Sequence, residues 1–234
     1  ADNMAIHTAI TQFGVKRIIT SSIEHHAVGH TAEAFKALYG VEVYYLNLDS
    51  KGNVDLSELE EKLNEEIPTL VSLMHANNEI ATLLPLQLVS KLCRKYGAYF
   101  HSDTVQTMGH YNFDLTELDI DFITCAAHKF HGPKGIGFLY ANKINRSNPL
   151  IHGGSQERGL RGGTENIAGI VGLCKAMELA YDALEDHQQH VWALKSYMID
   201  KLTDIFSDIA FHGETSFEKA LYTVLNVSLP PTSK

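Results

Sequence analysis

The chain has 234 residues, of which 44% are hydrophobic and 20% are charged, and this balance excludes a disordered segment. The formal net charge of −9 argues against a nucleic-acid backbone or an anionic membrane surface as the main partner. No apolar run is long enough to span a bilayer, and the first residues carry no signal-peptide pattern. We therefore expect a cytoplasmic protein with a small-molecule partner, no nucleic acid and no membrane.

Residues 1–13 have the apolar periodicity of a helix, and from there β-rich apolar runs alternate with amphipathic helices. This alternation predicts an α/β domain built on a mostly parallel sheet flanked by helices. Strands are predicted at 17–22, 41–47, 69–76, 98–103, 121–127 and 135–141. Helices are predicted at 27–39, 55–64 and 85–96, the first and the last followed by Gly40 and Gly97 as C-terminal caps. One long helix, 166–206, and a final strand follow.

The three cysteines, Cys93, Cys125 and Cys174, lie far apart and form no C-x-x-C pair. This spacing favours reduced thiols in a cytosolic protein over a disulfide framework. Each falls within a predicted helix or apolar strand. We therefore expect each to be a small buried hydrophobic side chain rather than a reactive thiolate.

Polar residues directly follow four of the predicted strands. In open α/β sheets, ligands bind beyond the carboxyl ends of the strands, so these residues are the candidates for a site. They are Glu24-His25-His26, Asn77-Asn78-Glu79, Asp103 with Gln106, and His128-Lys129. Taken singly, each residue type is more often a turn, a cap or a structural contact than a ligand.

Lys129 stands out because lysine is rarely placed at the end of so apolar a strand as DFITCAA unless its amine has a partner. A lysine amine, a carboxylate, an imidazole and an amide at one crevice are what a pyridoxal phosphate site needs. The lysine would form a Schiff base with the cofactor, and Asp103 would pair with the pyridinium nitrogen. An imidazole can stack on the ring, and an Asn or Gln can donate to its phenolic oxygen.

Five segments resemble, in order and in detail, the NifS-like cysteine desulfurases of the class V aminotransferase family, which are fold-type I pyridoxal phosphate enzymes. The segments are SIEHHAV, LMHANNEIATLLPL, HSDTVQ, AAHKFHGPKGIGFLY and GGSQERGLRGGTENIAGIVG, and they extend over nearly the whole chain. NNEI and RGGTEN are the most specific parts. The resemblance implies a cofactor-binding large domain at 1–165, a connecting helix at 166–206 and the start of a small C-terminal α+β domain at 207–234.

The resemblance also implies roles for individual residues. Lys129 would form the Schiff base and shuttle the substrate proton, His25 would stack on the ring, and Asp103 would contact the pyridine nitrogen. Asn78 and Gln106 would contact the phenolic oxygen of the ring. These five residues would hold the cofactor and activate it.

Two further residues would bind the cofactor phosphate. His128 would lie beside it, and Thr164 would reach the phosphate bound in a partner subunit, which implies a homodimer. The family's usual serine three residues before the lysine is here Ala126, so one phosphate hydroxyl is missing. The family's Gly-rich phosphate turn would lie just before Asp2, and its sulfur-attacking cysteine and substrate-binding arginine would lie beyond Lys234. We therefore expect that the chain by itself does not transfer sulfur.

The implied reaction removes sulfur from L-cysteine and leaves L-alanine and an enzyme persulfide, which a sulfur-acceptor protein could use, for example in iron–sulfur cluster assembly. Transamination or β-elimination on the same scaffold, and a non-catalytic paralogue, stay open as alternatives. A metal hydrolase with the HH pair His25-His26 and the H-x-D pair His101 and Asp103 as ligands lacks the spacing of a known zinc motif, so no metal is expected.

Overall fold

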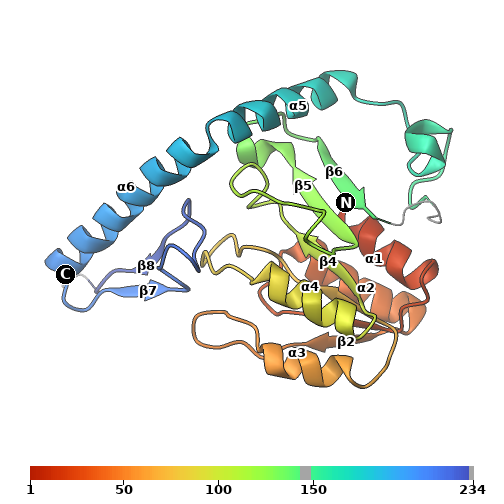
Figure 1. Ribbon diagram of the computed structural model, residues 1–234, viewed down its shortest axis with the longest axis horizontal. Coiled ribbons are helices and arrows are strands. Elements are labelled where there is room, and N and C mark those ends of the chain that lie inside the picture. The colour runs from red at the N-terminus through yellow and green to blue at the C-terminus, as the bar shows by residue number, and fades with distance from the viewer. Residues whose placement is uncertain (143–148, 232–234) are drawn as a thin grey trace.

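The computed structural model describes residues 1–142 and 149–231, and its centre is a six-stranded sheet with helices on both faces (Figure 1). The strands lie across the sheet in the order β2-β1-β3-β4-β5-β6. Their bounds are Arg17–Thr20 (β1), Glu42–Tyr45 (β2), Thr69–Ser72 (β3), Tyr99–Asp103 (β4), Phe122–Ala126 (β5) and Gly137–Ala141 (β6). Each lies within a predicted strand, so the α/β fold class is confirmed.

The pairs from β2 to β5 are parallel, whereas β6 runs antiparallel to β5. The carboxyl ends of β1, β3, β4 and β5 therefore meet at the same edge of the sheet. The predicted strand 69–76 is longer than β3, which ends at Ser72. The ladder with β4 nevertheless continues, because Leu73 N donates to the carbonyl of His101 (3.2 Å). His75 N likewise donates to the carbonyl of Asp103 (2.9 Å).

The first four helices flank the sheet, and three of them lie within one residue of their predicted bounds. They are α1 (Asp2–Thr11), α2 (His26–Tyr39), α3 (Leu56–Leu63) and α4 (Leu86–Lys95). At the start of α3, the Asp55 carboxylate accepts hydrogen bonds from the backbone N–H groups of Ser57 (2.9 Å) and Glu58 (3.0 Å). Gly40 ends α2 with φ 68, a left-handed conformation that glycine adopts without strain.

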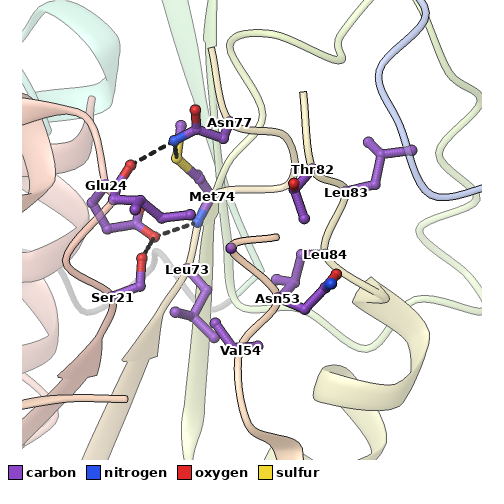
Figure 2. Close-up of a pocket in the computed structure, with 12 residues that line it drawn as sticks. Ser21, Glu24, Asn53, Val54, Leu73, Met74, Asn77, Thr82, Leu83 and Leu84 are labelled. Atoms are coloured by element: carbon purple, nitrogen blue, oxygen red, sulfur yellow. Dashed lines mark hydrogen bonds between the residues drawn. The ribbon is translucent and has the colours of Figure 1, made fainter. Parts of the chain in front are cut away.

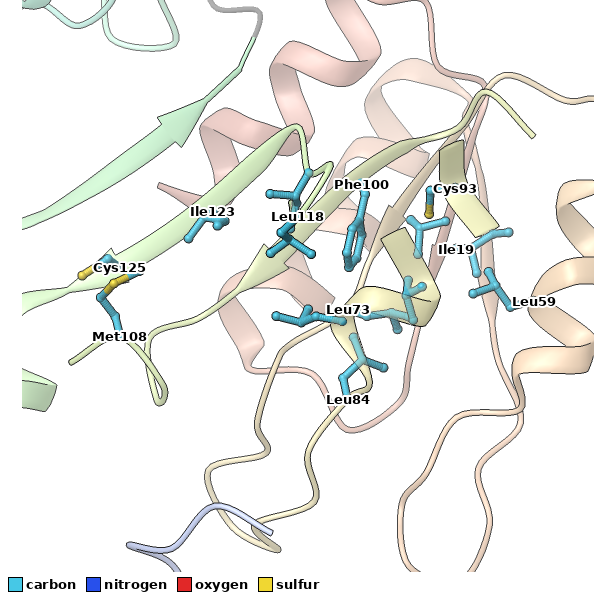
Figure 3. Packing of buried hydrophobic residues seen from close by; sticks show 14 of the residues in the cluster. Ile19, Leu59, Leu73, Leu84, Cys93, Phe100, Met108, Leu118, Ile123 and Cys125 are labelled. Atoms are coloured by element: carbon cyan, nitrogen blue, oxygen red, sulfur yellow. The ribbon is translucent and has the colours of Figure 1, made fainter. Parts of the chain in front are cut away.

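Both faces of the sheet are buried, because successive strand residues point to opposite sides. On one face, Ile19 and Phe100 belong to a cluster that includes residues of α3 and α4 (Figure 3). On the other face, Ile18, Leu70 and Phe122 pack with residues of α1 and α2. This two-sided burial holds the strands firmly, so the loops at their carboxyl ends start from a rigid base.

The C-terminal part differs from the prediction of one helix at 166–206. Two helices, α5 (Ile167–Asp182) and α6 (Leu184–Ile205), are separated at Ala183, whose φ of −109 and ψ of 15 are not helical. No Pro or Gly marks this break. The Tyr181 hydroxyl donates to the carbonyl of Tyr111 (3.3 Å) and Leu184 is buried, so tertiary contacts on both sides of Ala183 account for it.

A second, two-stranded sheet follows α6. Its strands β7 (Ala210–His212) and β8 (Asn226–Ser228) are antiparallel. In Figure 1 the two helices α5 and α6 form a long arm that leads from the large sheet to this small one. The segment between β7 and β8 returns toward the large sheet, where Leu221 N donates to the carbonyl of Ala81 (2.8 Å).

Two of the three cysteines are buried as predicted. Cys93 lies in α4 and Cys125 in β5, and burial raises the pKa of both thiols, that of Cys125 to about 12. The prediction is wrong for Cys174, which is exposed. Cys174 lies on α5. Only one side of this helix is buried, and the apolar residues Ile167 and Val171 are exposed as well.

None of the helices within residues 1–142 and 149–231 has the length and apolar character that a membrane span requires. Within the same residues, no three His, Cys, Asp or Glu side chains are grouped so that they could hold a metal ion.

Candidate active site

The predicted site residues gather at one edge of the sheet. His25 follows β1, Asn78 follows β3, Asp103 ends β4 and Lys129 follows β5. Three of these strands, β3, β4 and β5, are consecutive neighbours, and β1 pairs with β3. The four side chains therefore come from adjacent positions along this edge, as strand-end chemistry predicts.

The loops after β1 and β3 are fixed to each other by two side chains (Figure 2). Glu24 Oε1 accepts hydrogen bonds from the Ser21 hydroxyl (2.8 Å) and from Met74 N (3.0 Å). Asn77 Nδ2 donates to the carbonyl of Ile23 (2.8 Å). Because Glu24 precedes His25 and Asn77 precedes Asn78, these contacts position two of the predicted site residues.

Glu24 and Asn77 are among the predicted strand-end residues, but the sequence assigns them no function. The only sequence signal for their supporting role is their position beside His25 and Asn78. A cavity of about 30 Å³ lies between the two loops (Figure 2). It has room for about one water molecule and is lined by Glu24 and Asn77. The cavity is therefore too small to hold a substrate molecule.

His25 lies at the turn from β1 into α2 and caps that helix. Its Nδ1 accepts a hydrogen bond from Ala27 N (3.1 Å), so the proton of the neutral ring is on Nε2. The side chain is exposed. The cap therefore fixes the position of an imidazole ring that is accessible at the sheet edge.

Asp103 is the most buried of the predicted site residues, with 6% of its surface exposed. Its Oδ1 accepts a hydrogen bond from Val105 N (2.9 Å). Burial, and secondarily the negative charge of Asp2, raise the pKa of Asp103 to about 6, while the hydrogen bond from Val105 N and the neighbouring His101 and His25 act in the opposite direction.

Asp2, near the start of α1, belongs to a buried polar network behind Asp103. The Thr124 hydroxyl donates to Asp2 Oδ1 (2.6 Å), and His101 Nε2 lies 3.5 Å from the same oxygen. Burial acts to raise the pKa of Asp2, but hydrogen bonds and charge from His101, together with Thr124, lower it to about 2. Asp2 is therefore ionised next to the site. None of these contacts was predicted.

Lys129 lies in η1 (Ala127–Phe130), a short 3₁₀ helix that follows β5 directly, and both His128 and Lys129 are exposed. The chain then turns back as β6. A Cβ on Gly137 would lie 2.1 Å from the carbonyl oxygen of Cys125, so this close return requires glycine.

The other predicted residues differ in position. Gln106 and Asn78 are half-buried at the same edge of the sheet. Thr164 is exposed on the loop between η3 (Gln156–Gly159) and α5, which is not a strand end. The fold therefore gathers six of the seven predicted residues at one edge and leaves Thr164 on a separate loop.

We expect a Glu24→Gln variant to change the pH dependence of stability. Burial raises the pKa of Glu24 from 4.5 to about 8, and its Oε2 is inaccessible and has no hydrogen-bond partner. The folded chain therefore keeps a proton that the unfolded chain releases near pH 4.5, so this contribution to stability is full below that pH and is lost as the pH rises to about 8. Urea unfolding should show a steeper loss of stability between about pH 5 and pH 8 for the original chain than for Glu24→Gln.

The control variant is Glu79→Gln, since Glu79 is an exposed glutamate of the next loop. Its stability should change with pH as that of the original chain does. Equal slopes for all three proteins would contradict the raised pKa of Glu24.

Comparison with known proteins identifies the family of the chain. The model of the aminotransferase class-V family matches residues 1–231. The cysteine desulfurase IscS of Dictyoglomus turgidum is 43% identical over 218 residues, which cover 92% of this chain and 55% of that protein. A solved NifS-like protein has a TM-score of 0.89 and 39% identity, over 97% of this chain and 62% of its own. The structure of SspA in complex with cysteine has a TM-score of 0.78 and 31% identity, over 98% of this chain and 63% of its own.

This chain spans between about half and two thirds of the length of these relatives. The family model nevertheless covers nearly all of it, from the first helix to the end of the described residues. The chain belongs to the aminotransferase class-V family.

Proposed function

We propose that this chain is the cofactor-binding part of a pyridoxal-phosphate-dependent cysteine desulfurase, which removes sulfur from L-cysteine and leaves L-alanine. The observation that carries the proposal is the location of Lys129 and Asp103 at the carboxyl ends of the neighbouring strands β5 and β4. His25 follows β1, whose carboxyl end lies at the same edge of the sheet. The desulfurase relatives and the cysteine complex of SspA support the choice of substrate.

The side chains present fit the cofactor. Because burial raises the pKa of Asp103 to about 6, its carboxylate is incompletely compensated by positive charge, and a protonated pyridine nitrogen would supply the missing charge. The Lys129 side chain is exposed and accessible for covalent attachment. Ala126 offers no hydroxyl to the phosphate, so this contact has to come from elsewhere.

The remaining assignments use groups near the same edge. His25 would cover one face of the ring, Asn78 and Gln106 would donate to its phenolic oxygen, and His128 would lie beside the phosphate. Thr164 would serve the phosphate site of a partner subunit. Its exposure on a loop outside the cluster supports that role, since a residue that acts in a partner's site has to be accessible.

When bound, pyridoxal phosphate supplies a ring that accepts the electron pair left when the Cα proton of L-cysteine is removed. Asp103 would keep the ring nitrogen protonated, and the Lys129 amine would take the Cα proton and return it. An acceptor thiolate would form an S–S bond with the substrate sulfur while the Cβ–S bond breaks, and the electron pair of that bond would go to Cβ, which takes a proton and becomes the methyl group of alanine. Cys93 and Cys125 are buried with raised pKa values, so neither serves as this acceptor.

The domain assignment is part of the same proposal, with a cofactor-binding large domain at 1–165, a connecting segment at 166–206 and the beginning of a smaller domain at 207–234. The small antiparallel sheet at the end of α6 supports it. A homodimer, a sulfur-acceptor protein, a role in iron–sulfur cluster assembly and a cytoplasmic location complete the proposal.

The proposal is tested by incubating the chain with pyridoxal phosphate, reducing with borohydride and mapping the label by mass spectrometry. We expect the label on Lys129, and its loss in Lys129→Ala. Lys134→Ala is the matched control, because Lys134 is exposed, lies five residues away and follows no strand directly. If Lys129 carries no more label than Lys134, the amine has no special role and the proposal fails.

A further inference from the structure

His110 connects the turn that carries Lys129 to the C-terminal part of the chain. Its Nε2 lies 3.2 Å from the carbonyl oxygen of Lys129, and its Nδ1 lies 2.7 Å from the hydroxyl of Tyr222. His110 is 8% exposed and Tyr222 is 1% exposed, so the hydrogen bond between them is buried, whereas the one to the Lys129 carbonyl is partly buried. One imidazole ring thus joins two segments that are 93 residues apart.

The partners determine the protonation of the ring. A carbonyl oxygen only accepts, so Nε2 carries the proton and donates to Lys129, and Nδ1 of the neutral ring accepts from Tyr222. Burial lowers the pKa of His110, and burial raises the pKa of Tyr222 to about 12. Both groups are therefore neutral near pH 7, and both hydrogen bonds have a donor and an acceptor.

Tyr222 belongs to a well-anchored strap, residues 213–222, which crosses the loop after β3. Leu83 N donates to the carbonyl of Lys219 (2.9 Å), next to the hydrogen bond from Leu221 N to Ala81. The buried amine of Lys195 donates to the carbonyl of Leu221 (2.9 Å). The strap is thus tied to the loop that carries Asn78 and to helix α6, and His110 extends this connection to Lys129.

The Lys129 turn needs such support. η1 has four residues, and a 3₁₀ segment of this length has poor internal hydrogen-bond geometry. On its other side the turn packs against the residue before His110, since a Cβ on Gly109 would lie 2.8 Å from Cβ of Phe130. Gly109 and His110 thus both contact the turn, one through the side chain of Phe130 and the other through the carbonyl of Lys129.

We propose that His110 is a positioning residue, which holds the Lys129 turn to the strap through Tyr222 and so fixes the direction from which the Lys129 amine approaches its site. This inference rests on the proposed role of Lys129. According to this inference, the strap helps to position Lys129, although none of the strap residues would touch the cofactor.

Hydrogen exchange of the ligand-free chain tests the inference without any cofactor. The amides of His131 and Gly132 donate to the carbonyl of Ala127 and so report on the turn. In His110→Phe we expect their exchange to accelerate about fivefold, the effect of losing the one hydrogen bond that the ring makes to the turn, while the amides of β3 stay unchanged. His110→Gln, whose amide can donate from about the place of Nε2, should restore slow exchange.

Borohydride labelling supplies a second readout. The ratio of label on Lys129 to label on Lys134 should fall in His110→Phe and recover in His110→Gln. If His110→Phe does not fold, Tyr222→Phe, which removes one hydroxyl, should give a smaller acceleration of exchange confined to the turn. Unchanged exchange at the turn, or equal acceleration in β3, would overturn the inference. Absence of label from Lys129 in the unsubstituted chain would count against the proposed function alone, since exchange does not depend on the cofactor.

Discussion

An Arg17→Ala variant is expected to lose about 2–5 kcal/mol of its free energy of unfolding, the range for truncating a large buried side chain. Arg17 begins β1 and its side chain is fully buried. Its guanidinium pairs with the Glu65 carboxylate and donates to the carbonyl of Lys62. Its Nε donates to the Thr69 hydroxyl (3.3 Å). Truncation leaves a cavity beside β1 and β3 and removes the donors from three acceptors.

Urea unfolding followed by circular dichroism measures the loss, and two variants serve as references. Arg17→Met keeps most of the volume but leaves the same three acceptors without donors, so it should recover only the part of the loss that comes from the cavity. Arg94→Ala removes an arginine that is also ion-paired, with Asp119, but whose side chain is 55% exposed, so it should cost at most about 1 kcal/mol. Equal losses for Arg17→Ala and Arg94→Ala would show that burial of Arg17 is not the reason for its effect.

The strands and the strand-end residues could be predicted because their signals are local. The apolar run before Lys129, like the one before Asp103, shows within a few residues both that a strand is present and where it ends. The supporting contacts could not be predicted in this way. Thr124 and Asp2 are 122 residues apart in sequence, and His110 and Tyr222 are 112 apart, so these pairs depend on how the whole chain packs.

The break at Ala183 and the exposure of Cys174 have a similar cause. The apolar periodicity of residues 166–182 is that of a helix packed on the sheet, but how much of that helix is covered depends on its neighbours. The tertiary contacts of Tyr181 and Leu184 likewise end one helix and begin the next without a Gly or Pro. The local pattern therefore predicts that these residues are helical, but it does not predict where the helix breaks or which side chains are buried.

Asp103→Asn is expected to weaken the binding of pyridoxal phosphate to this chain by about 10–100-fold. In the proposed complex, the Asp103 carboxylate accepts a hydrogen bond from a protonated nitrogen, and a hydrogen bond to a charged group contributes about 1.5–3 kcal/mol. Asparagine keeps the shape and can still accept the hydrogen bond from Val105 N, which Asp103 Oδ1 now accepts at 2.9 Å. The loss should therefore appear in affinity and not in the folding of the chain.

The pH dependence of the same binding separates the charge of Asp103 from its shape. Because the pKa of Asp103 in the ligand-free chain is raised to about 6, the carboxylate forms as the pH rises through that value, and affinity should rise with it. Below about pH 6 the carboxyl is protonated, so the original chain should approach the weak affinity of Asp103→Asn.

Equilibrium titrations at several pH values measure the affinity of the original chain and of Asp103→Asn for pyridoxal phosphate. The difference between these two curves cancels the titration of the cofactor phosphate. The control is Asp208→Asn, because Asp208 is exposed. A constant ratio of affinities from about pH 5 to pH 8 would mean that the ionised Asp103 does not contact the cofactor.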